Sequence, residues 1–207
     1  MTKIFAHRGA SAYAPENTME AFELAAKQGA DGIELDVHVT KDGEVVVTHD
    51  EKIERVSNGS GFVKDMTLRE LKRLSFHNHM ESYVGAGIPT LREVLEFVKT
   101  TTMAVNIELK TGLYWYPDIE EKTVALVHEL GMQERIIYSS FNHHSIAKLK
   151  EIDSAAETAS LFSDVILNVE QYAKANGVEG LHPAVYHMYM SDFMKRWNES
   201  GEKVRVW

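Results

Sequence analysis

The stretch "GIELDVHVTKDGEVVVTHD", residues 32–50, holds the pattern from which the fold can be predicted. It predicts two strands, at about 32–39 and 44–48, and the first carries two acids among aliphatic residues. Side chains alternate between the two faces of a strand, so Glu34, Asp36 and His38 share one face. The aliphatic residues share the other, which we expect to be buried. Because a strand rises about 3.3 Å per residue, the two carboxylates stand about 6 to 7 Å apart at the backbone.

These paired carboxylates allow two interpretations. In the first, residues 32–39 form an edge strand whose polar face meets solvent. In the second, Glu34 and Asp36 point into a cleft, where two negative charges at this spacing repel each other unless a cation lies between them. Carboxylate oxygens are ligands that suit Mg²⁺ or Ca²⁺. The choice depends on which other side chains reach the same place.

Strand and helix patterns alternate along the rest of the chain. Further strands are predicted at 3–6, 103–109, 135–141, 157–162, 178–183 and 203–207, and helices at 15–29, 90–99, 117–131, 143–152, 168–177 and 191–201. Asn17 can cap the first helix, with Glu20 three residues on, and Asp118 and Glu121 repeat this spacing in the helix at 117–131. The alternation is typical of parallel strands with crossover helices, and about eight strands favour a TIM-type (β/α)8 barrel.

One region departs from this alternation. Between His49 and the helix at 90–99 lie about forty residues with one clear helical pattern, "TLRELKRL" at 67–74. Crossover loops usually have about two to six residues. We therefore interpret 51–89 as a small insertion after the third strand, within a single domain spanning 1–207. No helix follows the last strand, so the C-terminal end looks short, and we expect the natural chain to continue past Trp207.

Composition limits the classes of protein that fit. Lys and Arg number 22 against 31 Asp and Glu, a net charge of −9, so nucleic-acid binding, which needs a basic surface, is a poor fit. The chain has no cysteine, which excludes disulfides and thiolate chemistry. Neither a signal peptide nor an apolar run long enough to span a membrane is visible. We expect a soluble cytoplasmic protein.

Polar groups stand at the ends of four predicted strands. In a barrel, the carboxyl ends of the strands carry the chemistry. The side chains expected at this mouth are His7, Arg8, Glu34, Asp36, His49, Glu108 and Lys110. Each alone has a structural explanation, such as a capping histidine at a strand end, but the coincidence of seven indicates a functional site.

Several short motifs occur in order along the chain. They are His-Arg-Gly at 7–9, Pro-Glu-Asn-Thr at 15–18, Glu-Leu-Asp-Val at 34–37, Thr-His-Asp at 48–50, Glu-Leu-Lys at 108–110, Tyr-Pro-Asp-Ile-Glu-Glu-Lys at 116–122, Ser-Ser-Phe at 139–141 and the final Val-Trp. Together they resemble the glycerophosphodiester phosphodiesterase family, in the phosphatidylinositol phospholipase C-like group of TIM barrels. The similarity spans residues 3–207.

The resemblance implies a role for each matching position. Glu34, Asp36 and Glu108 match ligands of a divalent cation, Mg²⁺ or Ca²⁺; His7 and His49 match a general acid/base pair; Arg8 and Lys110 match phosphate-binding residues. The implied reaction is hydrolysis of a small-molecule glycerophosphodiester to an alcohol and glycerol 3-phosphate. At later strand ends, His182 and Trp207 are possible substrate contacts.

Two other activities use the same residues. A related barrel could form a cyclic phosphate and stop there, acting as a lyase with the same two histidines. A barrel could also bind metal and phosphoester without turnover. Such a protein would be expected to lack one of the acid/base histidines, but His7 and His49 are both present. Separately, the aromatic loop "LYWY" at 113–116 could stack on a cationic alcohol such as choline, or cover the core.

Overall fold

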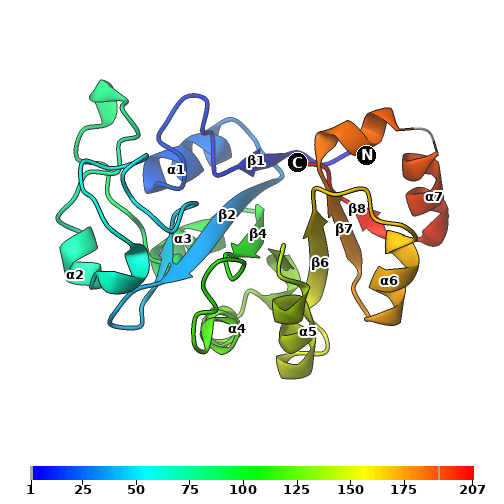
Figure 1. Ribbon diagram of the computed structural model, residues 1–207. Helices are drawn as coiled ribbons and strands as arrows, with labels where there is room; N and C mark the ends of the chain where they lie inside the picture. Colours follow the sequence, from blue (N-terminus) through cyan, green and yellow to red (C-terminus); the bar gives the residue numbers. More distant parts are fainter. Residues whose placement is uncertain (1, 191) are drawn as a thin grey trace.

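The computed structural model describes residues 2–190 and 192–207 and is built on a curled sheet with helices around its outside (Figure 1). The strands are β1 (Phe5–His7), β2 (Gly32–Val39), β3 (Val45–Val47), β4 (Ala104–Leu109), β5 (Ile136–Ser140), β6 (Glu157–Phe162), β7 (Gly180–Pro183) and β8 (Lys203–Val204). Their order is β1-β2-β4-β5-β6-β7-β8, and neighbours in this order run parallel. This is the barrel-type α/β fold that the sequence predicts.

The third predicted strand differs from the others in direction. β3 pairs antiparallel with β2, with His38 opposite Val46, and lies outside the main strand order. The two strands are joined by a short turn in which Gly43 has φ 90°. A turn this short allows only antiparallel pairing, because a parallel partner needs a crossover of about a dozen residues or more. Seven parallel strands therefore form the curled sheet, and within the described ranges β8 pairs with β7 alone.

The helices follow the strands as the alternation predicts. They are α1 (Met19–Lys27), α2 (Leu68–Leu71), α3 (Leu91–Lys99), α4 (Ile119–Leu130), α5 (His143–Ile152), α6 (Val169–Ala175) and α7 (Phe193–Ser200), with short 3₁₀ turns at Val63–Asp65, Glu81–Tyr83, Gln133–Arg135 and Val185–Tyr189. Ser191, the first residue predicted for the last helix, lies outside the described residues. A membrane-spanning helix is not found in the described part of the chain, where the longest helix, α4, has 12 residues.

One predicted N-cap is wrong, and one predicted capping box does not form. α1 begins after Thr18, whose side-chain oxygen accepts the N–H of Ala21 at 3.4 Å, whereas Asn17 has a left-handed backbone, φ 57°. At α4, Asp118 occupies the N-cap position, but its φ is 59° and its side chain makes no capping hydrogen bond. An N-cap needs extended backbone to aim its side chain at the first N–H groups. The left-handed conformation, which Asn and Asp tolerate, turns the side chain elsewhere.

β2 is buried on both faces. Ile33, Leu35 and Val37 pack in the main core between the sheet and its helices. On the opposite face Asp36 is 1% exposed and His38 is fully buried. The interpretation of this stretch as an edge strand with a solvent-facing side is therefore wrong, because β1 and β4 flank β2 on its two sides.

The segment between β3 and α3 lies beside β2, in cyan to blue-green in Figure 1. It has its own apolar cluster, formed by Ile53, Val56, Val63, Leu71, Phe76 and Ile88 together with Val46 of β3. α2 begins with a capping box in which Thr67 and Glu70 satisfy each other's backbone N–H groups. These contacts give the segment a fixed backbone next to β3. Its description as an inserted part of one domain stays a prediction.

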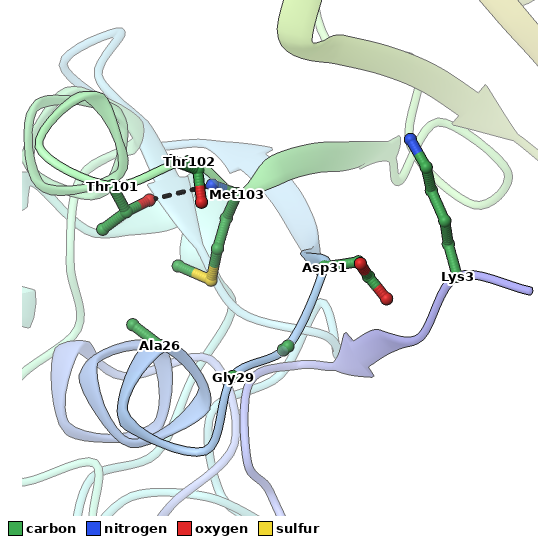
Figure 2. A pocket seen from close by; sticks show the side chains of 8 residues that line it. Lys3, Ala26, Gly29, Asp31, Thr101, Thr102 and Met103 are labelled. Atoms are coloured by element: carbon green, nitrogen blue, oxygen red, sulfur yellow. Dashed lines mark hydrogen bonds between the residues drawn. The ribbon is translucent and has the colours of Figure 1, made fainter. Parts of the chain in front are cut away.

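A surface hollow lies at the amino ends of the strands. Figure 2 shows Lys3 before β1, Asp31 before β2 and Met103 before β4 around it, with Gly29 at the end of α1. Asp31 accepts the N–H of Ile4 at 2.8 Å and so ties the two connections together. Barrel enzymes keep their chemistry at the carboxyl ends of the strands. We therefore place the candidate site at the other end of the sheet.

Candidate active site

Three carboxylates meet towards the carboxyl ends of β2 and β4. Asp36 and Glu108 are partners in the parallel register, and Glu34 lies two residues earlier on β2, on the same face. One oxygen from each acid lies within 4.8 Å of the other two. Asp36 and Glu108 are buried and Glu34 is partly buried. Three acids in so small a volume form a set of ligands for a hard cation.

Burial and mutual repulsion disfavour the charged forms of the two glutamates, Glu34 and Glu108. Burial raises the pKa of Glu34 well above its usual range, and the charges of Asp36 and Glu108 raise it further. Burial is also the main cause that raises the pKa of Glu108, followed by the charge of Asp36. A positive ion placed among the three would stabilise their charged forms and so counteract both shifts. The electrostatics of the cluster therefore favour cation binding.

The connection between β1 and α1 orients two of the acids. Arg8 has φ 57°, and its backbone N–H donates to Oε2 of Glu34 at 3.0 Å. The amide Nδ2 of Asn17 donates to Oδ2 of Asp36 at 2.8 Å. The Arg8 guanidinium lies beside the same oxygen, with Nε 3.6 Å away. These contacts fix the directions in which the two carboxylates point.

Lys110 brings positive charge to the cluster from the end of β4. Its Nζ lies 2.8 Å from Oε1 of Glu108 and 3.6 Å from Oδ1 of Asp36. Burial would lower the pKa of Lys110, but the charges of Glu108 and Asp36 outweigh it and raise the pKa. The three carboxylates still outnumber the two fixed cations, Arg8 and Lys110. With all three acids ionised, the cluster would carry a net negative charge, which a divalent ion would reverse.

The two predicted acid/base histidines both border the cluster. His7 lies at the end of β1, half-exposed, with Nε2 3.8 Å from Oε2 of Glu34. Its remaining burial and the charge of Arg8 lower its pKa. His49 follows β3, and its Nε2 lies 3.2 Å from Nζ of Lys110. The structure therefore brings all seven side chains predicted for the mouth into one connected group.

His182 lies on β7, further round the sheet, and Trp207 follows the neighbouring strand β8. His182 is buried, with Nη1 of Arg205 3.4 Å from its Nε2, and burial together with the charge of Arg205 lowers its pKa to about 3. Trp207 is 46% exposed and donates from Nε1 to the carbonyl of His182 at 2.9 Å. Its ring meets Phe141 edge-on, with centroids 5.5 Å apart. Substrate contact by either residue stays a prediction.

Two supporting residues were missed by the sequence reasoning. The ring of His38 bridges Tyr116, whose hydroxyl is 2.8 Å from Nδ1, and the carbonyl of His49, 3.1 Å from Nε2. His38 therefore holds the backbone of His49. Asp50 accepts from Nδ1 of His49, with Oδ1 2.6 Å away. The signals were present: His38 shares the face of Glu34 and Asp36, and Asp50 directly follows His49.

The aromatic loop at 113–116 divides between core and solvent. Tyr116 is buried, and Tyr114 packs against the main core. Leu113 and Trp115 are exposed, at 65% and 62%. The interpretation of the loop as a cover for the core holds for the two tyrosines, whereas stacking on a cationic alcohol stays a prediction.

Known proteins share this fold and extend over the whole chain. The crystal structure of a glycerophosphodiester phosphodiesterase from Agrobacterium tumefaciens has a TM-score of 0.87 at 33% identity, covering 100% of this chain and 86% of that one. An Oleispira antarctica phosphodiesterase, solved in complex with the product sn-glycerol-3-phosphate, has a TM-score of 0.88 at 28% identity, covering 100% and 84%. Fold and site together define the class of barrel-type phosphodiesterases.

The sequence comparisons identify the family. The model of the Glycerophosphoryl diester phosphodiesterase family matches residues 7–207, and the chain belongs to this family. A curated relative, the glycerophosphodiester phosphodiesterase of Caldanaerobacter subterraneus, is 41% identical over 207 residues, which cover 100% of this chain and 85% of the relative. The chain is therefore an enzyme of the phosphoric diester hydrolase class, as the sequence resemblance implies.

Proposed function

We propose that the chain hydrolyses glycerophosphodiesters to an alcohol and glycerol 3-phosphate, using a divalent cation and two histidines at the mouth of the barrel. The observation that carries this proposal is the cluster of Glu34, Asp36 and Glu108, bordered by two histidines and two fixed cations. The Oleispira antarctica relative solved with sn-glycerol-3-phosphate supports the substrate class.

The acidic cluster fits Mg²⁺ or Ca²⁺, which both prefer oxygen ligands. Glu34, Asp36 and Glu108 would hold the ion. Its charge would oppose the effects of burial and mutual repulsion that raise the pKa values of Glu34 and Glu108. Asn17 and the backbone N–H of Arg8 would keep the ligands oriented. When bound, the ion supplies positive charge that stabilises the negative phosphate oxygens of the transition state.

Arg8 and Lys110 would bind the phosphate from the protein side. The guanidinium of Arg8 is planar and can donate to two oxygens, and the ammonium of Lys110 acts as a point charge. Both side chains are mostly buried, at 19% and 14% exposed. Their charges are therefore weakly screened by solvent and act strongly on a negative substrate at this place.

His7 and His49 would move the two protons of the reaction. The attacking hydroxyl loses a proton as its oxygen bonds to phosphorus, and the leaving alcohol gains one as its bond to phosphorus breaks. Imidazole can accept or donate near neutral pH, so one histidine takes the first proton while the other supplies the second. The two rings border the acidic cluster through Glu34 and Lys110 respectively.

A substrate screen tests this function. The purified protein is assayed with glycerophosphodiesters and lysophospholipids in Mg²⁺, in Ca²⁺ and in excess chelator, and the phosphorus products are resolved by ³¹P NMR. We expect glycerol 3-phosphate and free alcohol, with the rate abolished by chelator. Accumulation of a cyclic diester would assign the lyase reaction instead, and no turnover of any glycerophosphodiester would overturn the proposal.

A further inference from the structure

We propose that Arg55, in the segment between β3 and α3, is a positioning residue that sets the orientation of His49 through Asp50. The inference rests on the proposed acid/base role of His49 and extends it to a part of the chain outside the barrel strands. Arg55 contacts neither His49 nor the acidic cluster in the hydrogen bonds found among the described residues. It acts through two carboxylates, Glu16 and Asp50.

The guanidinium of Arg55 uses three of its N–H groups on these two acids. Nη1 and Nη2 donate to the two oxygens of Glu16 at 2.9 and 2.8 Å, a bidentate pair. Nε donates to Oδ2 of Asp50 at 2.5 Å. Such a planar fork fixes the relative position of its partners better than a flexible ammonium can. Arg55 therefore locks Asp50 to Glu16, which belongs to the connection between β1 and α1.

Asp50 passes this orientation on to the imidazole of His49. One oxygen, Oδ2, accepts from Arg55, and the other, Oδ1, lies 2.6 Å from Nδ1 of His49. A carboxylate can only accept, so the imidazole proton lies on Nδ1 and Nε2 is left unprotonated in the neutral ring. Nε2 is the atom that faces Lys110. With Asp50 held by Arg55, the tautomer and the ring plane of His49 are both set.

Glu16 links the same clamp to the phosphate-binding side of the site. Its Oε1 also accepts from Nη1 of Arg8 at 3.0 Å, so Glu16 joins two arginines. Burial would raise the pKa of Glu16, but the hydrogen bonds and charges of Arg55 and Arg8 lower it. The pKa of Asp50 is lowered in the same way, since hydrogen bonds from Arg55 and His49 outweigh burial. Both acids are held in the charged form that Arg55 requires.

The backbone that carries Arg55 is itself fixed. Its neighbours Ile53 and Val56 are 0% and 3% exposed within the apolar cluster of the segment. The carbonyl of Ile53 accepts the N–H of Val56 at 3.3 Å and that of Ser57 at 3.0 Å, which closes a turn around Arg55. A guanidinium on such a packed turn has little freedom to leave its two acids. The segment between β3 and α3 thus contributes a residue to the geometry of the site.

The test compares Arg55→Gln and Arg55→Lys with the parent enzyme and with Arg69→Gln, a matched control on the exposed face of α2. We expect Arg55→Gln to lose about 10- to 100-fold in kcat with KM little changed, as is usual for groups that orient a catalytic ligand. Arg55→Lys should lose less, because an ammonium can serve one of the acids at a time, and Arg69→Gln should match the parent. A rise in KM with parental kcat would place Arg55 on the phosphate side and overturn the inference.

The second readout is the tautomer of His49, measured from imidazole ¹⁵N shifts in the substrate-free protein. We expect the Nδ1–H form in the parent and a mixture of Nδ1–H and Nε2–H forms in Arg55→Gln. An unchanged tautomer overturns the inference whatever the rate. Should Arg55→Gln fail to fold, kcat and the His49 tautomer are measured in Arg55→Lys instead. A parental kcat together with a parental tautomer in that variant would overturn the positioning role of the Arg55 guanidinium.

A third variant separates this inference from the function on which it rests. If His49→Ala retains the parental rate, the acid/base role fails and Arg55 is not the cause. If His49→Ala is impaired, the double variant His49→Ala with Arg55→Gln should be no slower than His49→Ala alone, because Arg55 acts only through that ring. An additional loss in the double variant would show that Arg55 acts elsewhere and would overturn the inference.

Discussion

The side-chain amide of Asn17 donates a hydrogen bond of 2.8 Å to Oδ2 of Asp36, although Asn17 stands where the sequence predicts a helix cap. Thr18 caps α1 in its place, and the left-handed backbone of Asn17 turns the amide towards β2. Consecutive residues of Pro-Glu-Asn-Thr thus have different roles. Glu16 accepts hydrogen bonds from two arginines, Asn17 donates to a carboxylate, and Thr18 caps the helix. The motif is a short support for the acidic cluster.

Replacing Asn17 should destabilise the protein through Asp36. Asn17→Gly keeps the positive φ at no steric cost but leaves a buried carboxylate oxygen without its donor, which costs about 1 to 3 kcal/mol. Asn17→Asp replaces the donor by a fourth acid facing Asp36 and should cost more. Urea unfolding in excess chelator measures both. Added Mg²⁺ or Ca²⁺ should restore much of the loss in Asn17→Asp, and parental stability of that variant without a cation would contradict the assignment.

Removing one charge from the acidic cluster should weaken metal binding and turnover together. Glu34→Gln keeps the shape of the side chain, and its amide is a poorer ligand for a hard cation than a carboxylate. We expect calorimetry to show a weaker affinity for Mg²⁺ or Ca²⁺, with a parallel loss of rate. Glu23→Gln, on the exposed face of α1, is the matched control and should change neither. Full turnover after exhaustive chelation would remove the basis for a metal-dependent reaction.

Much of the fold could be predicted because its signals are local. The alternation of strands and helices fixes a parallel α/β sheet, and β2 lies at Gly32–Val39, the range that the alternating pattern gives. The direction of β3 could not be obtained from a strand count, because an antiparallel hairpin strand has the same composition as a parallel one. The length of the turn around Gly43 carries that information.

The charged residues of the site could be predicted from the sequence, whereas the residues that orient them were missed. Glu34, Asp36 and Glu108 stand out because acids are rare in buried strands. Asn17 does not, because its amide has several local uses and only its backbone conformation chooses among them. Arg55 does not stand out either, because its pairing with Glu16 spans 39 residues that only the folded chain brings together.

The two histidines should behave as one unit in catalysis. We expect His7→Ala and His49→Ala each to lower the rate by about 10²- to 10⁴-fold, with substrate binding less affected. The double variant should be little slower than the slower single one, because both act on the same transition state. His144→Ala, an exposed histidine of α5, is the control. Retention of near-parental rate by either single variant would show that its imidazole carries neither proton.

The attachment of the last strand should depend on pH through Glu157. Glu157 of β6 accepts from Nζ of Lys203 at 2.6 Å and from Nη2 of Arg205, so one carboxylate joins β6 to β8 across β7. Burial would raise the pKa of Glu157, but the hydrogen bonds and charges of Lys203 and Arg205 lower it below its ordinary 4.5. A carboxyl whose folded pKa is lowered contributes stability above its unfolded pKa. That contribution is lost as pH falls through the folded value.

Glu157→Gln should therefore be less stable than the parent at pH 7 by about 1 kcal/mol, a modest value because the pair is partly exposed. For a chain of this size, that corresponds to about 2 to 4 °C in Tm. The difference should shrink as the pH falls from about 4.5, the ordinary pKa of a Glu side chain, towards the lower pKa of Glu157 in the folded protein, where the native carboxyl also becomes protonated. Thermal unfolding of both proteins at a series of pH values measures it, and a difference that stays constant down to the acid limit would show that Glu157 stabilises β8 by packing and not by charge.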